Sequence, residues 1–436
     1  MTGGDAEDLD VVSLVEGAGE IDRGACRAAG HIVPTLLEGD HDSHRTASLA
    51  RGPRVAVRPG SLDTLAPRAR VTVTLCFGAP AALPSGMKVL VTGSAGLIGS
   101  EAVEFFDRLG FRVDGIDNNG RADFFGPSGD TTWNRQRLEE SCSAYVHHDL
   151  DIRDFTAVDE LFATRGFDLV VHAAAQPSHD LAARRPVDDF ETNANGTLHL
   201  LEACRRHTPD AVFVYVSTNK VYGDNPNRLE LVELDTRWDY ADAAYAEGID
   251  ETMSVEGCLH SLFGVSKLSA DLACQEYGRY FGLKTGVFRG GCLTGPHHSG
   301  VELHGFLSYL VTTALREDPY TIFGYKGKQV RDQIHSHDVI SAFWAFAQDP
   351  RPGEVYNLGG GRSNAASLLE CVEMIADRTG KRPELSYDDT NRVGDHICYY
   401  TDMGKFRAHH PDWRQAYSLE AIVDEMVDRV AHRLGA

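Results

Sequence analysis

The chain has 436 residues, of which 42% are hydrophobic, and a formal net charge of −22. This apolar content suffices for a sizeable core in two or three domains, whereas the negative charge argues against nucleic acid or an anionic membrane surface as a partner. No apolar run approaches the roughly 18 residues that a membrane-spanning helix requires.

Residues 1–86 differ in composition from everything that follows them. They are rich in Gly, Ala, Arg, Asp and Pro, contain no Lys, and show neither a helical nor an alternating hydrophobic period. Their first residues are acidic, where a secretory signal requires positive charge. We therefore interpret residues 1–86 as a disordered or dispensable extension, regard Met87 as a candidate natural start, and expect a cytoplasmic protein.

The stretch 88–99 joins a β-branched apolar run to three glycines, at Gly93, Gly96 and Gly99. We interpret it as a buried strand, a tight turn and the start of a helix. Each glycine can meet one requirement of a dinucleotide site. The turn needs a positive φ, the pyrophosphate must approach backbone that carries no side chain, and the helix must lie close to the sheet. A second strand ends in Asp117, at the spacing of a carboxylate that binds an adenosine ribose and repels a 2′-phosphate. The pattern therefore predicts NAD rather than NADP as the cofactor.

From Met87 onward, short apolar runs alternate with helical periods. The runs predict strands over 88–92, 112–116, 144–147, 168–173, 211–217 and 284–289, and helices over 97–109, 155–164, 187–207, 264–281, 303–316, 337–348, 366–379 and 419–433. This repetition predicts an α/β fold with a doubly wound parallel (Rossmann) sheet. We expect an NAD-binding domain over 87–295 and a smaller, mainly helical substrate-binding domain over 296–436, with 337–358 returning to the first domain.

Several separated motifs follow one another in a fixed order. They are Gly93-Ser-Ala-Gly96-Leu-Ile-Gly99, Asp151-Ile-Arg-Asp154, His172-Ala-Ala-Ala175, Asn193-Ala-Asn-Gly-Thr197, Ser217-Thr-Asn-Lys-Val-Tyr-Gly223, Lys267 and Gln329-Val-Arg-Asp332. From Met87 to about residue 430 the chain resembles the extended short-chain dehydrogenases/reductases that epimerise or dehydrate nucleotide sugars. Within that family, the motifs at 217–224, 260–261 and 327–332 are most similar to those of the CDP-paratose (CDP-tyvelose) 2-epimerase group.

The resemblance implies a set of cofactor-binding residues. Asp151 and Ile152 would hold the adenine, residues 173–175 would line the cofactor, Asn193 would lie near the nicotinamide side, and Lys267 would bond the nicotinamide ribose. The full set that we expect to bind NAD is Gly93, Gly96, Leu97, Ile98, Gly99, Asp117, Asn118, Asp151, Ile152, Ala173, Ala174, Ala175, Asn193, Ser217 and Lys267.

The resemblance also places Thr218 where the family has a hydroxyl that bonds the reacting sugar oxygen. Similar 4,6-dehydratases follow this hydroxyl with an Asp-Glu pair, whereas this chain has Asn219 and Lys220. A neutral amide and an ammonium group cannot supply the acid and base for an elimination. The pattern therefore favours epimerisation over dehydration.

Phe263 departs from the family. A catalytic Tyr is expected four residues before Lys267, and a phenyl ring transfers no proton. Three interpretations remain open. Another group could act as the base, with Lys220, His260 and Thr218 as candidates; the proton could be left to the substrate or to water; or redox activity could have been lost.

Histidine and cysteine residues form no metal-ligand pattern. The nine cysteines lack CxxC or Cys/His spacing, so we expect free thiols and no bound metal. The histidines at 297, 298 and 304 instead follow a Thr-Gly-Pro turn at which the family contacts sugar. Arg331 and Arg392 lie in loops where the resemblance expects an arginine on the substrate diphosphate, which a guanidinium suits. The expected substrate-binding residues are Asn219, Arg289, His304, Gln329, Arg331 and Arg392.

The leading hypothesis is an NAD-dependent nucleotide-sugar epimerase that oxidises its substrate transiently and resembles CDP-paratose 2-epimerase. Two alternatives stand beside it: another nucleotide-sugar oxidoreductase, and a catalytically impaired protein that binds NAD and a nucleotide sugar. Since the family pairs two long helices from each subunit, with counterparts at 187–207 and 264–281, we also expect a homodimer or a larger homo-oligomer.

Overall fold

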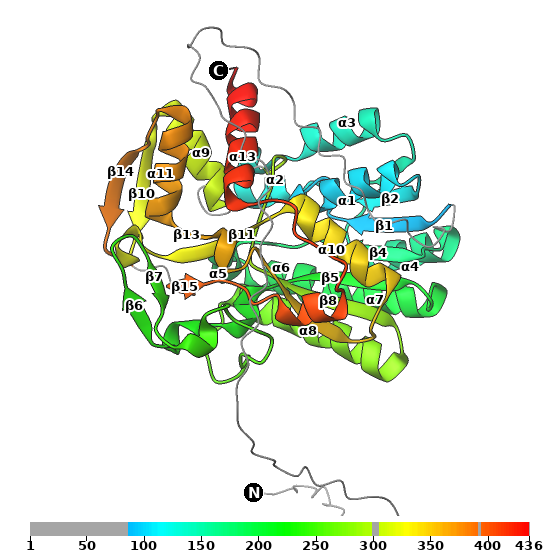
Figure 1. Ribbon diagram of the computed structural model, residues 1–436. Coiled ribbons are helices and arrows are strands. Elements are labelled where there is room, and N and C mark those ends of the chain that lie inside the picture. Colours follow the sequence, from blue (N-terminus) through cyan, green and yellow to red (C-terminus); the bar gives the residue numbers. More distant parts are fainter. Residues whose placement is uncertain (1–85, 299–304, 391–393, 436) are drawn as a thin grey trace, which may run out of the picture. The chain divides into compact units, whose positions relative to one another are not determined.

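The computed structural model of the protein describes residues 86–298, 305–390 and 394–435. Seven parallel strands run through its centre in the order β12-β8-β5-β4-β1-β2-β3 (Figure 1). They are β1 (Lys88–Thr92), β2 (Arg112–Ile116), β3 (Tyr145–His148), β4 (Leu169–His172), β5 (Val212–Thr218), β8 (Lys284–Gly290) and β12 (Glu354–Leu358). The chain extends the sheet in one direction after β1 and in the other after β4. This topological switch leaves a crevice at the carboxyl ends of these two strands.

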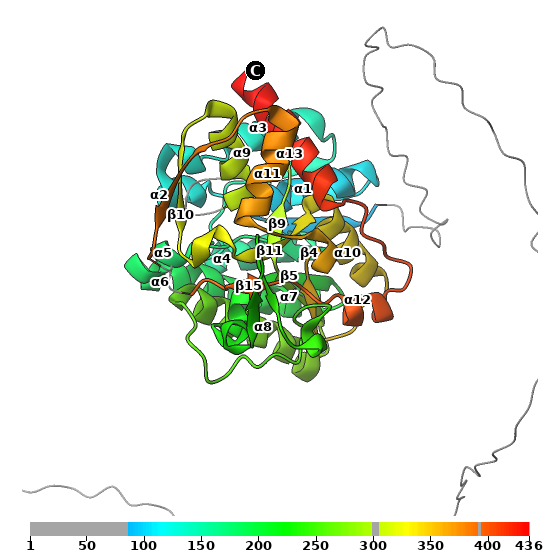
Figure 2. The same cartoon turned by 60° about the vertical axis from the view of Figure 1, so that its left-hand side comes forward.

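Helices cover both faces of this sheet, which confirms the predicted doubly wound fold (Figure 2). One face packs against α1 (Leu97–Arg108), α3 (Thr132–Ser141), α10 (Ser336–Gln348) and α12 (Gly404–His409). The other face packs against α4 (Phe155–Arg165), α7 (Gly196–His207) and α8 (Leu262–Phe281). Because both faces are covered, strands such as β4 are buried along their whole length, and β4 is apolar up to its last residue, His172.

The segment predicted as one helix over 187–207 contains a π-helical turn. α6 (Pro186–Phe190) leads into this turn, Glu191–Asn195, and α7 follows it. Within the turn, the Asn193 side chain accepts a hydrogen bond from the Gln176 backbone N–H and donates one to the Gln176 carbonyl, at 2.9 and 3.0 Å. These two bonds tie the π-helical turn to the loop that follows β4.

The C-terminal part contains more strands than the sequence predicted. Its helices are α9 (Phe306–Arg316), α11 (Leu368–Thr379) and α13 (Leu419–Leu434), and they share a core with β10 (Pro319–Phe323), which pairs with β14 (Glu384–Asp388). A further small sheet joins β9 (Cys292–Thr294), β11 (Val330–His335), β13 (Ala365–Ser367) and β15 (Cys398–Tyr399). The polar insert after β5 carries the hairpin β6 (Leu231–Glu233) and β7 (Trp238–Tyr240). Within the described ranges, no helix is long and apolar enough to span a membrane.

Candidate active site

A cavity of about 550 Å³ opens at the carboxyl ends of the central strands. The loops after β1, β2, β4 and β5 form one wall, and α8 contributes to it. Residues of β9, β10 and β11 face this wall from the C-terminal part. The cavity therefore lies at the topological switch point, where doubly wound proteins bind their ligands.

The three glycines of the first loop have different surroundings. Gly93 has a φ of +67°, and a side chain there would come within 2.9 Å of the Ala174 backbone. A Cβ on Gly99 would lie only 2.0 Å from the Gly93 carbonyl oxygen, so this glycine permits close packing of α1 on the loop. A Cβ on Gly96 would meet only that oxygen, at 3.2 Å, and would otherwise face open space. A pyrophosphate at the start of α1 fits this open space.

Asp117 follows β2 and lies beside the glycine loop. One of its oxygens accepts a hydrogen bond from the Ala95 N–H at 3.0 Å, and the other accepts one from the Asn119 N–H at 2.8 Å. Burial raises the pKa of this carboxyl above its usual value. Each oxygen keeps a second lone pair, so the carboxylate can also accept from the hydroxyls of a ribose.

The adenine end of the expected cofactor site is formed by Asn118, Asp151 and Ile152, which all line the cavity. Asn118 donates to an Asp151 oxygen at 3.1 Å, and Arg153 forms an ion pair with the same carboxylate at 2.6 Å. Leu97 and Ile98 line the cavity from α1. These polar contacts hold Asn118 and Asp151 in the cavity wall, and the buried Ile152 contributes an apolar surface to the same wall.

Residues 173–175 line the cavity, whereas Asn193 does not. Asn193 is buried behind the following loop and holds it through the two bonds to Gln176 described above. Asn193 therefore lies behind the cavity wall and does not line the expected cofactor site.

Lys267 reaches the cavity from α8. Its ammonium group donates to the Val216 carbonyl at 2.7 Å and lies 4.4 Å from the centre of the Tyr215 ring. Burial lowers the pKa of Lys267 to about 8, although nearby acidic groups raise it. The group therefore remains a cation at neutral pH and is well placed to donate to a ribose hydroxyl.

The end of β5 supplies Ser217, Thr218 and Asn219 to the cavity wall. Ser217 donates to Asp271 at 2.7 Å, and the Thr218 hydroxyl accepts from the Lys220 N–H at 3.2 Å. Asn219 is buried. These hydroxyls stand on the same wall as Lys267, as the resemblance requires.

Phe263 lies in the first turn of α8 and is 7% exposed. Its ring contacts the ring of His179, with 5.0 Å between the centroids and 57° between the planes. Both rings line the cavity, together with Lys267. His179 begins α5 (His179–Arg184) and was not among the predicted site residues.

Lys220 also reaches the cavity, and its ammonium group is bonded on two sides. It donates to the Gly394 carbonyl at 2.8 Å and to an Asp395 oxygen at 3.2 Å. Burial lowers the pKa of Lys220, against the raising effect of Asp395. Arg331 approaches the same carboxylate, at 4.0 Å, and lines the cavity with Gln329. The Gln329 side-chain oxygen is buried without a hydrogen-bond partner among the described residues.

Besides Asn193, two predicted site residues lie outside the cavity wall. His260 donates through Nε2 to the Val255 carbonyl at 2.8 Å and packs beside Cys258. Arg289 forms a buried ion pair with Asp271 at 3.0 Å, behind Ser217. The remaining two predictions, His304 and Arg392, lie outside the described residues.

Sequence reasoning missed His179 and Asp395. His179 begins α5, just after the loop that contains residues 173–175, so a rule that inspects strand ends would have found it. Asp395 carries no local signal, because only the tertiary fold brings its loop to Lys220.

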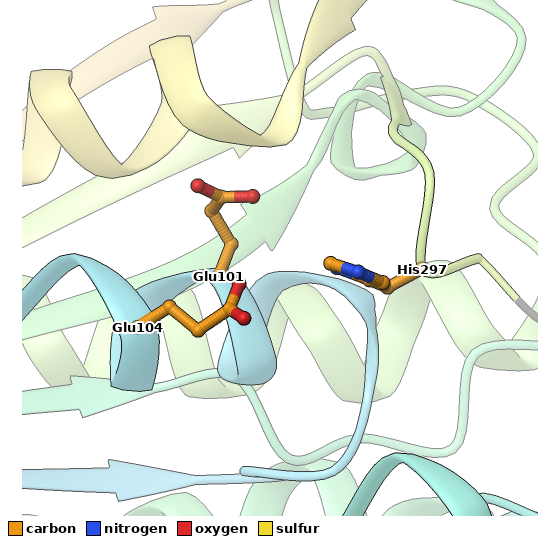
Figure 3. Close-up of side chains that lie close together, drawn as sticks. All are labelled: Glu101, Glu104 and His297. Carbon is orange, nitrogen blue, oxygen red and sulfur yellow. The ribbon is translucent and has the colours of Figure 1, made fainter. Parts of the chain in front are cut away.

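One group of potential metal ligands is present among the described residues. Glu101 and Glu104 of α1 lie near His297 (Figure 3), and the ligand atoms of the three residues lie within 4.8 Å of one another. Each carboxylate already has a cationic neighbour, since Glu104 is paired with Arg137 and Glu101 lies 3.8 Å from Arg108. These arginines supply the counter-charge that a metal ion would otherwise provide, so we assign no metal to this group.

Comparisons with known proteins agree with this geometry. The model of the NAD dependent epimerase/dehydratase family matches residues 89–359. CDP-paratose 2-epimerase from Salmonella typhi is 31% identical over 352 residues, which cover 78% of this chain and 98% of that protein. dTDP-glucose 4,6-dehydratase 1 from Escherichia coli K12 is 30% identical over 306 residues, which cover 67% of this chain and 76% of that protein.

A solved structure of UDP-glucuronic acid 4-epimerase from Bacillus cereus is similar as well. It is 26% identical, has a TM-score of 0.63, and covers 80% of this chain and 100% of its own. That structure is a tyrosine-to-phenylalanine mutant in complex with UDP-4-deoxy-4-fluoro-glucuronic acid and NAD. The similarity therefore extends to a protein that holds both ligands.

Proposed function

The chain belongs to the NAD-dependent epimerase/dehydratase family, and from that premise we propose that it epimerises a nucleotide-activated sugar through a transient keto sugar. The observation that carries this proposal is the meeting of Thr218, Lys267 and the Gly93–Gly99 loop on the walls of one cavity. When bound there, NAD supplies a nicotinamide that takes a hydride from carbon and can return it.

The residues present favour epimerisation over elimination. Elimination needs a carboxylic acid and a carboxylate next to the reacting sugar. Asn219 and Lys220 occupy the positions after Thr218, and neither is a carboxyl group; Lys220 is ion-paired with Asp395. Thr218 is left to orient the reacting hydroxyl, while Lys267 holds the nicotinamide ribose.

The far end of the cavity suits the nucleotide diphosphate. Arg331 offers a guanidinium to the phosphate oxygens. The Gln329 oxygen, which has no hydrogen-bond partner among the described residues, can accept from a sugar or nucleotide hydroxyl. We propose that the substrate is CDP-paratose or a related CDP-deoxysugar, inverted at carbon 2, because the Salmonella typhi relative carries that activity in its name.

A second candidate function is a protein that binds NAD and a nucleotide sugar without turning the sugar over. Phe263 favours it, since the phenyl ring occupies the position of the family's proton-transferring tyrosine. The Bacillus cereus tyrosine-to-phenylalanine mutant holds both ligands, so such a ring is compatible with binding.

We further propose a cytoplasmic location and a homodimer. The described cysteines, Cys142, Cys204, Cys258, Cys274, Cys292, Cys371 and Cys398, are all free thiols, as expected in a reducing compartment. The dimer is argued from the exposed faces of α7 and α8 in the Discussion.

The test is turnover of a panel of nucleotide sugars, followed by NMR. CDP-paratose and CDP-tyvelose come first, then UDP and GDP sugars. The epimerase proposal expects each CDP-sugar to give a mixture of both epimers at catalytic enzyme concentration, without NADH accumulation. If the wild type converts no sugar in the panel while Phe263→Tyr does, the second candidate function is correct.

A further inference from the structure

We propose that Gln333 binds a ring hydroxyl of the substrate sugar, other than the hydroxyl that is oxidised, and so selects sugars that carry it. This inference rests on the proposed function, because it takes a nucleotide sugar as the ligand of the cavity. Gln333 directly follows the Gln329-Val-Arg-Asp332 motif and is not part of it. Neither the motifs nor the relatives assign a role to this residue.

Three polar side chains alternate along β11 and the residue before it. Gln329, Arg331 and Gln333 all line the cavity. The intervening residues, Val330 and Asp332, are buried and do not line it. Because successive side chains of a strand point to opposite faces, the three polar groups share the face toward the cavity. With Arg331 proposed to bind the diphosphate, Gln333 lies next to that group on the same face.

The amide of Gln333 is buried, and one of its ends is unsatisfied. The residue is 1% exposed, and its Oε1 accepts a hydrogen bond from the Thr294 hydroxyl at 2.7 Å. Its Nε2 is buried and has no hydrogen-bond partner among the described residues. A buried amide group without a partner is costly, so native proteins rarely contain one unless a water molecule or a ligand completes it.

The Cys292 thiol does not take the place of such a partner. Cys292 pairs with Gln333 between β9 and β11 (Figure 2). Burial raises the pKa of this thiol to about 11, and the Gln333 amide acts against that rise. The thiol is therefore protonated at neutral pH, and its sulfur is only a weak hydrogen-bond acceptor. The amide keeps its capacity for a stronger bond to an oxygen atom.

Two strand pairings connect Gln333 to the wall where the sugar is proposed to react. Thr218, at the end of β5, pairs with Gly290 at the end of β8. Cys292 follows Gly290 by two residues and pairs with Gln333. All four residues line the cavity. A sugar that is held by Thr218, with its diphosphate on Arg331, therefore has Gln333 as a neighbour in the wall.

A sugar hydroxyl fits the unsatisfied end of the Gln333 amide. A hydroxyl both donates and accepts, so it completes this end whichever way the amide group is turned. The amide carries no charge and takes no part in bond making or breaking. Its contribution is selection, because a substrate without the hydroxyl would leave the amide buried and unpaired.

The test measures binding to the NAD-loaded protein by calorimetry. The ligands are CDP-paratose, its analogue without the non-reacting ring hydroxyl, and CDP, which has no sugar. Gln333→Met removes the amide and keeps an unbranched side chain, and Gln348→Met, at the exposed end of α10, is the matched control.

We expect Gln333→Met to weaken the binding of CDP-paratose by at least about tenfold and to change the binding of CDP by less than about twofold. The wild type should bind the analogue at least about tenfold more weakly than CDP-paratose, whereas Gln333→Met should bind both alike. Gln348→Met should match the wild type. If another sugar of the panel binds best, that sugar and its nucleotide take the place of CDP-paratose and CDP.

Thermal unfolding separates binding from a structural role. Gln333→Met replaces an incompletely paired buried amide with an apolar side chain of similar shape, and the Thr294 hydroxyl still has the Cys292 carbonyl at 3.3 Å. Its melting temperature should therefore equal or exceed that of the wild type. Gln333→Asn, which keeps an amide but withdraws it by one methylene group, should weaken CDP-paratose as well, and it serves for the comparison if Gln333→Met does not fold.

Two results would overturn the Gln333 proposal and leave the epimerase proposal, which depends on turnover, unaffected. One is binding of CDP-paratose by Gln333→Met within about twofold of the wild type, and the other is equal weakening of CDP-paratose and CDP. If the wild type binds no sugar of the panel more tightly than the nucleotide alone, the Gln333 proposal is also wrong. A wild type that selects CDP-paratose through Gln333 but converts no sugar would support this binding role and contradict the epimerase proposal.

Discussion

Gly96 and Gly99 stand one helical turn apart, yet a side chain would have opposite consequences at the two positions. A Cβ on Gly96 faces the open space proposed for the pyrophosphate, so Gly96→Val should fold and weaken NAD binding by at least about 100-fold. A Cβ on Gly99 would collide with the Gly93 carbonyl, so Gly99→Ala should cost on the order of 3 kcal/mol in stability. Calorimetry with NAD and thermal unfolding measure both effects. Undiminished NAD binding by folded Gly96→Val would contradict the assignment of the phosphate site.

Lys267 gives the protein a pH-dependent stability. Its pKa falls from an unfolded value of 10.5 to about 8 because the side chain is buried. Between these values the unfolded chain binds the proton and the folded chain does not, so this group's contribution to the free energy of unfolding rises with pH, by about 3 kcal/mol in all. Below pH 8 both states are protonated and the contribution is constant.

Lys267→Met should therefore remove this increase in the free energy of unfolding with pH. Denaturant unfolding at pH 7 to 10, without added NAD, should show the wild type gaining stability relative to the variant as pH increases. A difference that stays constant over this range would contradict the low pKa.

At the scale of elements, α8 carries an apolar face that is exposed among the described residues. Leu262, Val265 and Leu272 are each at least 40% exposed and lie at helical spacing, and Leu198 of α7 is exposed as well. Apolar stripes of this kind on long helices are typical of subunit interfaces. We expect the homodimer to form through this face.

Leu272→Arg should convert the dimer to a monomer without unfolding it. Light scattering at micromolar concentration measures the change, and Leu385→Arg, at a similarly exposed leucine of β14, should leave the dimer intact. A wild-type monomer, or dissociation by both variants alike, would contradict the assignment of this face.

The elements also show what sequence alone could predict. The sequence predicts β1, β4 and β5 because apolar runs mark them, and it predicts α10, α11 and α13 because their apolar periodicity is strong. β15 has only two residues and β13 three, so their pairing with β11 depends on tertiary contacts that no local pattern encodes.

In the candidate site, too, some residues carry local sequence motifs and others are brought together only by the tertiary fold. The glycine loop, Asp117 and Lys267 carry local motifs, and the structure brings them to one cavity. The pairing of His179 with Phe263 and that of Lys220 with Asp395 join segments that are far apart in the chain, so only the fold could reveal them.

For the whole molecule, the sequence predicts that the fold begins at Met87. The Met87 carbonyl already accepts a hydrogen bond from the Arg112 N–H at 2.9 Å, at the entry to the central sheet. A chain that starts at Met87 should keep the melting temperature and NAD content of the full-length protein, because residues 1–86 lack the patterning of a packed domain. Differential scanning fluorimetry and release of bound nucleotide measure both quantities. A melting temperature lower by more than about 5 °C would mean that the extension packs on the fold.

The central claim is that the sugar is oxidised and reduced again within one cavity, so the hydrogen on the inverted carbon never reaches solvent. The most direct measurement is NMR of the product formed from CDP-paratose deuterated at carbon 2, in ordinary water with catalytic amounts of the protein and NAD. The account predicts that the product epimer retains the deuterium at carbon 2 and that no NADH accumulates. Replacement of the deuterium by solvent hydrogen, stoichiometric formation of NADH, or the absence of any epimer would contradict it.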